Sequence, residues 1–178
     1  MRALVVYESM YGNTHVVADH IAEGLRRDFE VDVVPVAQAT KERVAAADLV
    51  VVGGPTHAHG MSSRQTRKAA VDATKVKVDG LEVDMDAKGE GLRDWFHELG
   101  PCTGAAAAFD TRMDMARALT GHASGGITRR LRRAGFTVIS SPTSFFVTKQ
   151  ERLADGEADR ATEWGAALTR SAHFAPTW

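Results

Sequence analysis

A group of side chains able to bind an anion lies near the start of the chain, in the stretch Ser9-Met-Tyr-Gly-Asn-Thr14. It offers three hydroxyls and one amide but no lysine or arginine. If a helix begins here, an anion can still be bound, because the first N–H groups of a helix are unpaired and carry partial positive charge. Hydroxyl donors at such a place suit a terminal monophosphate better than a pyrophosphate or a triphosphate. Alternatively, Asn13 or Thr14 serves only as the N-cap of that helix.

The flanking residues predict the elements that would position this stretch. Ala3 to Tyr7 is a short apolar run, typical of a strand buried on both faces, and the polar residues Glu8 to Asn13 break it. From Thr14 onward an apolar residue recurs at every fourth position, which indicates an amphipathic helix. The sequence excludes two nucleotide-binding motifs, because neither the dinucleotide-binding motif G-x-G-x-x-G nor the NTPase motif G-x-x-x-x-G-K-[ST] follows the first strand.

The rest of the chain predicts alternating strands and helices. Further strands are expected at Glu30–Val36, Leu49–Gly53, Ala105–Phe109 and, as one last strand interrupted at Pro142, Thr137–Ser140 with Ser144–Thr148. Helices are expected at Lys41–Asp48, Ser62–Ala73, Gly91–Gly100, Ile127–Gly135 with Ser124 as its cap, and Gly156–Ser171. Lys75 to Lys88 fits either a small hairpin around Asp79-Gly80 or a loop. We therefore expect an α/β fold, a doubly wound sheet of five parallel strands with helices on both faces, as a single domain over residues 1–178.

Three loops of the chain resemble the flavin loops of the flavodoxin family. Ser9 to Thr14 is similar to the family's FMN-phosphate loop, [ST]-x-[ST]-G-x-T, although Tyr11 takes the second hydroxyl position. Gly54-Pro-Thr56 resembles the second flavin loop, and Asp110 to Met113 has the position of the third. The resemblance implies non-covalently bound FMN and the strand order 2-1-3-4-5. It covers nearly the whole chain except an extra segment at about 75–99, which could partly cover the flavin or form an interface.

The resemblance also implies which residues hold the cofactor. They are Ser9, Met10, Tyr11, Gly12, Asn13, Thr14, Pro55, Thr56, His57, Ala58, His59, Gly60, Phe109, Asp110, Thr111 and Arg112. Gly60 would allow a backbone conformation closed to other residues. Because no tyrosine or tryptophan follows the fourth predicted strand, Phe109 could instead be an inward, structural residue. Asp110 could accept a hydrogen bond from the N3 edge of the flavin and Arg112 could lie near its pyrimidine side, or both could be solvated.

Two clusters allow more than one interpretation. His57 and His59 could pack against the flavin or be exposed loop residues, while a metal site would need a third ligand at a recognisable spacing. The helix from Ile127 carries four arginines, Arg129, Arg130, Arg132 and Arg133. Such a run is typical of a solvated helix face, and it could also bind an acidic partner or the 2′-phosphate of NADPH.

Composition limits the possible partners and compartments. The net charge of −1, from 22 basic and 23 acidic residues, gives no overall field that would attract nucleic acid or an anionic membrane. No apolar run approaches the ~20 residues of a membrane span. We expect a cytoplasmic protein, and the single cysteine, Cys102, rules out an intramolecular disulfide.

Two functional classes follow from the resemblance. The protein could be an electron carrier that serves a redox partner protein, or an FMN-dependent oxidoreductase that uses NAD(P)H or a quinone. Low-potential flavodoxins are strongly acidic. This chain, with a net charge of −1 and an arginine-rich helix, departs from that acidic composition. The departure counts against the electron-carrier interpretation, although both classes stay open.

Overall fold

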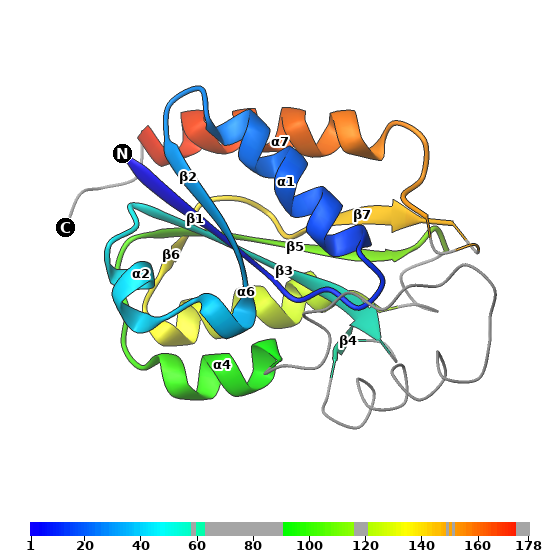
Figure 1. The fold of residues 1–178 in the computed structure, drawn as a ribbon. Coiled ribbons are helices and arrows are strands. Elements are labelled where there is room, and N and C mark those ends of the chain that lie inside the picture. Colours follow the sequence, from blue (N-terminus) through cyan, green and yellow to red (C-terminus); the bar gives the residue numbers. More distant parts are fainter. Residues whose placement is uncertain (58–59, 63–90, 116–120, 149, 151, 174–178) are drawn as a thin grey trace.

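The computed structural model describes residues 1–57, 60–62, 91–115, 121–148, 150 and 152–173, drawn as a ribbon in Figure 1. The strands are β1 (Arg2–Tyr7), β2 (Glu30–Pro35), β3 (Leu49–His57), β4 (Gly60–Met61), β5 (Ala105–Met113), β6 (Thr137–Val138) and β7 (Thr143–Val147). The helices are α1 (Asn13–Leu25), the 3-10 helix η1 (Val36–Gln38), α2 (Lys41–Ala45), α4 (Leu92–Leu99), α6 (Ala123–Ala134) and α7 (Glu157–His173). The predicted helix over Ser62–Ala73 and the segment Lys75–Lys88 lie outside the described residues, apart from Ser62.

The sheet has the predicted parallel topology. Its strand order is β2-β1-β3-β5-β6, and β7 also pairs with β5 in parallel. Thus β6 and β7 act as one last strand interrupted around Pro142, which confirms the prediction. The short antiparallel strand β4, which pairs with the end of β3, was not predicted.

Helices cover both faces of this sheet, as Figure 1 shows. Alternate residues of each strand point to opposite faces. Val5, Val51 and Phe109 belong to the core under α1 and α7, whereas Val6 and Val52 belong to the core under α2, α4 and α6. Trp95 of α4 is buried in this second core, and its Nε1 donates to the Ala39 carbonyl at 2.7 Å, so it is the core anchor that the sequence indicates.

Two strands run further than predicted. β3 continues through Gly54 to His57, and β5 continues through Asp110 to Met113. Their parallel pairing persists up to Pro55 opposite Thr111. A proline is tolerated there because β1 has already ended at Tyr7, opposite Gly53, so no strand on that side needs an N–H donor from Pro55. Residues expected in loops are therefore strand residues.

One predicted helix start is wrong, and one helix has a cap other than those considered. α6 begins at Ala123 rather than Ile127, and Ser124 lies inside its first turn instead of capping it. α1 begins at Asn13 with Gly12 as its N-cap, so neither Asn13 nor Thr14 is the cap. In both cases the local residue type suggested a cap, but α6 receives its caps from the strand ends, where Thr56 and Asp110 accept from its first two N–H groups.

Candidate functional site

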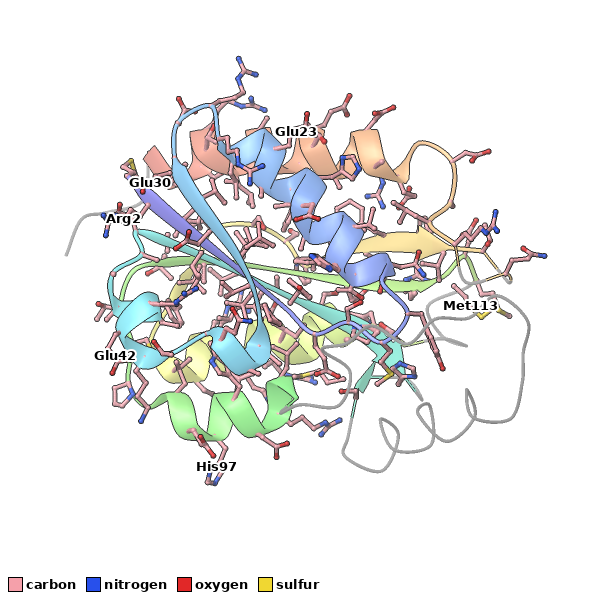
Figure 2. All side chains as sticks on the ribbon, viewed as in Figure 1. Arg2, Glu23, Glu30, Glu42, His97 and Met113 are labelled. Carbon is pink, nitrogen blue, oxygen red and sulfur yellow. The ribbon has the colours of Figure 1, made fainter. Side chains whose placement is uncertain are left out.

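The carboxyl ends of three neighbouring strands form the edge where the predicted site residues lie. Tyr7 of β1 is opposite Gly53 of β3, and Gly53 is opposite Phe109 of β5. Figure 2 labels Met113 at this edge and Arg2 with Glu30 at the opposite, amino-terminal end of the sheet. The structure therefore brings the described residues of three predicted stretches to one edge, where ligands of parallel sheets bind. The first stretch is Ser9–Thr14, the second is Pro55–Gly60 and the third is Phe109–Arg112.

The first stretch leads into α1 through a tight turn. Gly12 has φ 84°, a conformation that favours glycine, and its N–H donates to Ser9 Oγ at 3.1 Å. Because the N-cap residue is glycine, α1 has no cap side chain, and its first turn contains no acidic residue. By contrast, α2 has Thr40 as an accepting cap and Glu42 in its first turn. The amino end of α1 therefore keeps a partial positive charge that an anion could neutralise.

A direct contact joins the first and third stretches. Thr14 Oγ1 lies 2.8 Å from Thr111 Oγ1, a buried hydrogen bond in which either hydroxyl can donate. Ser9, Met10 and Thr14 are buried, whereas Tyr11, Gly12 and Asn13 are half-buried and form the more open part of the turn. This contact holds the start of α1 against β5.

The second stretch is split between strand and hairpin. Pro55, Thr56 and His57 are half-buried at the end of β3, and His57 pairs with Gly60 in β4. Thr56 Oγ1 accepts from the Ala123 N–H of α6 at 2.9 Å. Gly60 does not have a positive φ, so the special backbone conformation expected there is not found. Ala58 and His59 lie outside the described residues.

His57 is the titratable group in this stretch with a perturbed pKa. Burial lowers the pKa of its imidazole, and the Glu8 carboxylate partly opposes that effect. The neutral imidazole is therefore favoured in the fold. Among the described residues no group of three histidine, cysteine, aspartate or glutamate side chains could hold a metal ion.

In the third stretch the structure turns two side chains into the protein. Phe109 is fully buried and packs edge-on against Phe145 and Trp164, which is the structural role considered for it. Asp110 is also fully buried, and its Oδ2 accepts from the Ser124 N–H of α6 at 2.7 Å. Asp110 and Thr56 thus cap α6 from the strand ends.

Arg112 also makes contacts within the chain. Its guanidinium carbon lies 4.7 Å from the centroid of the Phe146 ring, and its Nη1 donates to the Met115 carbonyl at 2.6 Å and the Met113 carbonyl at 3.3 Å. These bonds tie down the chain that follows β5. The residue is 8% exposed, so it is largely buried rather than solvated.

Glu8 is a buried residue at this edge that sequence reasoning left unassigned. Its carboxylate accepts from the Ser62 hydroxyl and, at 2.8 Å, from the Leu92 N–H, while its own N–H donates to the Gly53 carbonyl at 2.9 Å. It therefore binds the start of α4 to the end of β1. The available signal was an acidic residue directly after a fully apolar strand, a place where a charge needs partners.

Comparisons with known proteins agree with this fold. The sequence model of the family described as Flavodoxin matches residues 5–99. A flavodoxin of Aquifex aeolicus (strain VF5) is 43% identical over 58 residues, which cover 32% of this chain and 31% of that protein. The chain thus matches about a third of that relative's length.

Solved structures extend the likeness to the whole chain. A flavodoxin from the domain Archaea has a TM-score of 0.66 at 18% identity, covering 97% of this chain and 99% of the other. Oxidised Flavodoxin 1 from Bacillus cereus has a TM-score of 0.65 at 17% identity, covering 96% and 98%. At such identities the likeness shows the fold. None of the described helices is long and apolar enough to cross a membrane. With a family match over more than half of its residues and the flavodoxin fold throughout, the chain belongs to the flavodoxin family.

Proposed function

We propose that this protein binds FMN without a covalent bond at the carboxyl edge of β1, β3 and β5 and carries electrons to and from a partner protein. The observation that carries the proposal is the start of α1. Its N-cap is Gly12, its first turn has no acid, and the hydroxyls of Ser9 and Thr14 lie beside it. A dianionic phosphate placed there would meet backbone N–H groups and hydroxyl donors in a region of positive potential.

The donor set fits a phosphate that ends a small molecule. The bond from Gly12 N–H to Ser9 Oγ uses that oxygen as an acceptor, so the Ser9 hydroxyl proton can still point to another acceptor. Thr14 can take the accepting role in its bond with Thr111, which would free its own proton in the same way. A Cβ built at Gly12 would meet no heavy atom within 4 Å, so the turn is open on that side.

Bound FMN would supply the reversible redox chemistry. The protein's own groups bind and orient it. Ser9 and Thr14 would hold the phosphate, while the ends of β3 and β5 would fix the ring position through backbone groups. The contacts of Thr56 and Asp110 with α6, and of Arg112 with Phe146, keep those strand ends rigid.

The phosphate assignment is tested by comparing two ligands that differ only in that group. The double variant Ser9→Ala/Thr14→Ala should bind FMN at least about tenfold more weakly, because each charge-assisted hydrogen bond contributes roughly 1.5 to 3 kcal/mol. Riboflavin affinity should change little. Thr40→Ala, which removes a hydroxyl cap from the distant helix α2, is the matched control and should leave both affinities alone. Equal losses for FMN and riboflavin would show that the loop does not hold the phosphate.

The carrier assignment needs a separate measurement on the FMN-loaded protein. A carrier should consume NAD(P)H only when a second, NAD(P)H-oxidising flavoprotein is added to reduce it. Steady NAD(P)H oxidation by the purified protein with a quinone as acceptor, and no other protein present, would show that the protein is an oxidoreductase rather than a carrier. Because the ligand comparison does not depend on turnover, the two results can be separated.

A further inference from the structure

A groove lined with cations runs between α4 and α6, outside the predicted flavin site. It encloses about 500 Å³. Its charged lining comes from both helices, and apolar residues of α4 and of the turn that follows lie between the charges. The lining residues that matter here are Arg93, Phe96, His97, Pro101, Arg130 and Arg133.

Helix periodicity explains why these side chains share one groove. Arg93, Phe96 and His97 occupy positions i, i+3 and i+4 of α4, which lie on the same side of a helix. Arg130 and Arg133 are likewise three residues apart on α6. Figure 2 shows His97 projecting from α4 toward the outside of the molecule. Arg93, His97 and Arg133 are exposed, and Arg130 is half-buried.

The positive charge of the groove is concentrated, and the described residues supply no ion pair that would neutralise it. Burial lowers the pKa of the Arg130 guanidinium, and the neighbouring charges of Arg93, Arg129 and Arg133 lower it further. Within the described ranges, none of the lining arginines forms an ion pair with a carboxylate. Like charges are thus held close together at a cost that an anionic partner would relieve.

One end of the groove reaches the candidate site. The Arg93 guanidinium donates to the Ser62 carbonyl at 2.7 Å and to the Met61 carbonyl at 2.9 Å. Met61 belongs to β4, which pairs with the end of β3 that carries His57. The Arg93 end of a molecule lying in the groove would therefore be near the edge where we place the flavin, and the molecule would not touch the residues assigned to the flavin.

We propose that this groove is a docking site for an acidic segment of a partner protein. Carboxylates of the segment would pair with Arg93, Arg130 and Arg133, and an apolar side chain between them would pack on Phe96 and Pro101. Bidentate pairing with arginine suits carboxylates and adds directional specificity. The apolar residues between the cations favour a peptide over a small inorganic anion, because such an anion would gain nothing from them. None of these residues belongs to the predicted flavin site, so the inference does not depend on FMN binding.

The test uses the full-length protein and a short fluorescein-labelled peptide rich in glutamate with leucines at intervals, followed by fluorescence anisotropy. The double variant Arg130→Glu/Arg133→Glu should lower peptide affinity by at least about tenfold. Arg129→Glu/Arg132→Glu is the matched control, because it changes the net charge equally on the same helix through exposed side chains outside the groove. The control should lower affinity by less than about threefold. Phe96→Ala should weaken binding without any change in charge.

Several results would overturn the docking proposal. Equal losses in the two double variants would mean that only the general charge of α6 attracts the peptide. If pyrophosphate displaced the peptide and bound as tightly as the peptide does, the groove would be a small-anion site. Self-association that Arg130→Glu/Arg133→Glu abolishes, without peptide binding by the original protein, would assign the groove to a second copy of this chain. The exposed single variant Arg133→Glu keeps the test valid if the change at half-buried Arg130 prevents folding.

Discussion

At the level of single residues, side chains of the chain itself satisfy most of the α-helix starts that the structure describes. Thr40 caps α2, Glu8 accepts from the first N–H of α4, and Asp110 with Thr56 accepts from the first two N–H groups of α6. The first turn of α7 carries its own acids. α1 differs because a glycine caps it and its first turn has no acid. This contrast supports our proposal that the start of α1 binds an anion from outside the chain.

His57 should make the stability of the protein depend on pH. Burial lowers the pKa of its imidazole below the ordinary value near 6.5, so the unfolded chain binds more protons than the folded chain between the two pKa values. Its contribution to stability is therefore complete above about pH 6.5 and is lost as the pH falls toward the folded-state pKa. The variant His57→Gln should show a smaller decrease in Tm between pH 7.5 and 5.5 than the original protein, as measured by thermal denaturation at both pH values. The same decrease in both proteins would show that His57 is not responsible.

The residues of the site were predictable to different degrees. The hydroxyls of Ser9 and Thr14 stand in a local motif, so their place at the start of a helix follows from the sequence. The inward orientation of Asp110 does not, because it depends on the first N–H groups of α6, more than ten residues further along the chain. Glu8 was missed for the same reason, since its partners Ser62 and Leu92 are distant in sequence.

At the level of elements, α1 and α7 pack closely enough that glycine is required at their contact. A Cβ built on Gly24 would lie 2.1 Å from the Thr162 carbonyl oxygen, and one on Gly165 would lie 2.2 Å from the Ile21 carbonyl oxygen. Both obstacles are backbone atoms, which cannot rotate away. The two helices would have to separate to admit a methyl group.

The variant Gly165→Ala should therefore destabilise the protein. Alanine gains about 1 kcal/mol over glycine in a helix interior, whereas overpacking costs about 1–3 kcal/mol or more. Because the clash is with backbone, we expect a net loss of at least about 1 kcal/mol, which lowers Tm by roughly 2–4 °C for each kcal/mol. Urea denaturation gives the free energy of unfolding directly. Gly126→Ala in α6 is the control, since its nearest obstacle is the flexible Met61 side chain at 3.4 Å. Equal or greater stability of Gly165→Ala would contradict this account of the contact.

The elements themselves were largely predictable, and their ends were not. Buried parallel strands appear as continuous apolar runs and amphipathic helices as fourfold spacing, so the elements and the two helical layers followed, whereas the strand order came from the family resemblance. Gly54-Pro55 looked like the end of a strand, yet β3 continues to His57 because β5 pairs with it up to Pro55 and β4 pairs with its last two residues. Strand length is set by neighbouring strands, which a single segment of sequence does not contain.

At the level of the whole molecule, a net charge near zero conceals an uneven distribution. Arg93 of α4 and Arg130 with Arg133 of α6 collect around one groove, whereas acids such as Glu30 at the start of β2 and Glu23 near the end of α1 are exposed elsewhere. Figure 2 shows Glu23 and Glu30 on the side of the molecule opposite His97. Net charge alone is thus a poor guide to which partners this protein can attract.

FMN should stabilise the whole fold if the proposed site is correct. A ligand that binds only the folded state adds RT ln(1 + [L]/Kd), about 2.7 kcal/mol at a hundred times Kd. For a domain of 178 residues this corresponds to a rise in Tm of roughly 5–11 °C. Thermal denaturation of three samples separates the contribution of the phosphate from that of the ring: the original apoprotein with FMN, the same apoprotein with riboflavin at the same concentration, and the variant Ser9→Ala/Thr14→Ala with FMN. We expect the largest rise in Tm for the original protein with FMN, because only there does the phosphate meet both hydroxyls at the start of α1. A shift as large with riboflavin would place the binding energy in the ring alone, and the absence of any shift with FMN would refute cofactor binding by this chain.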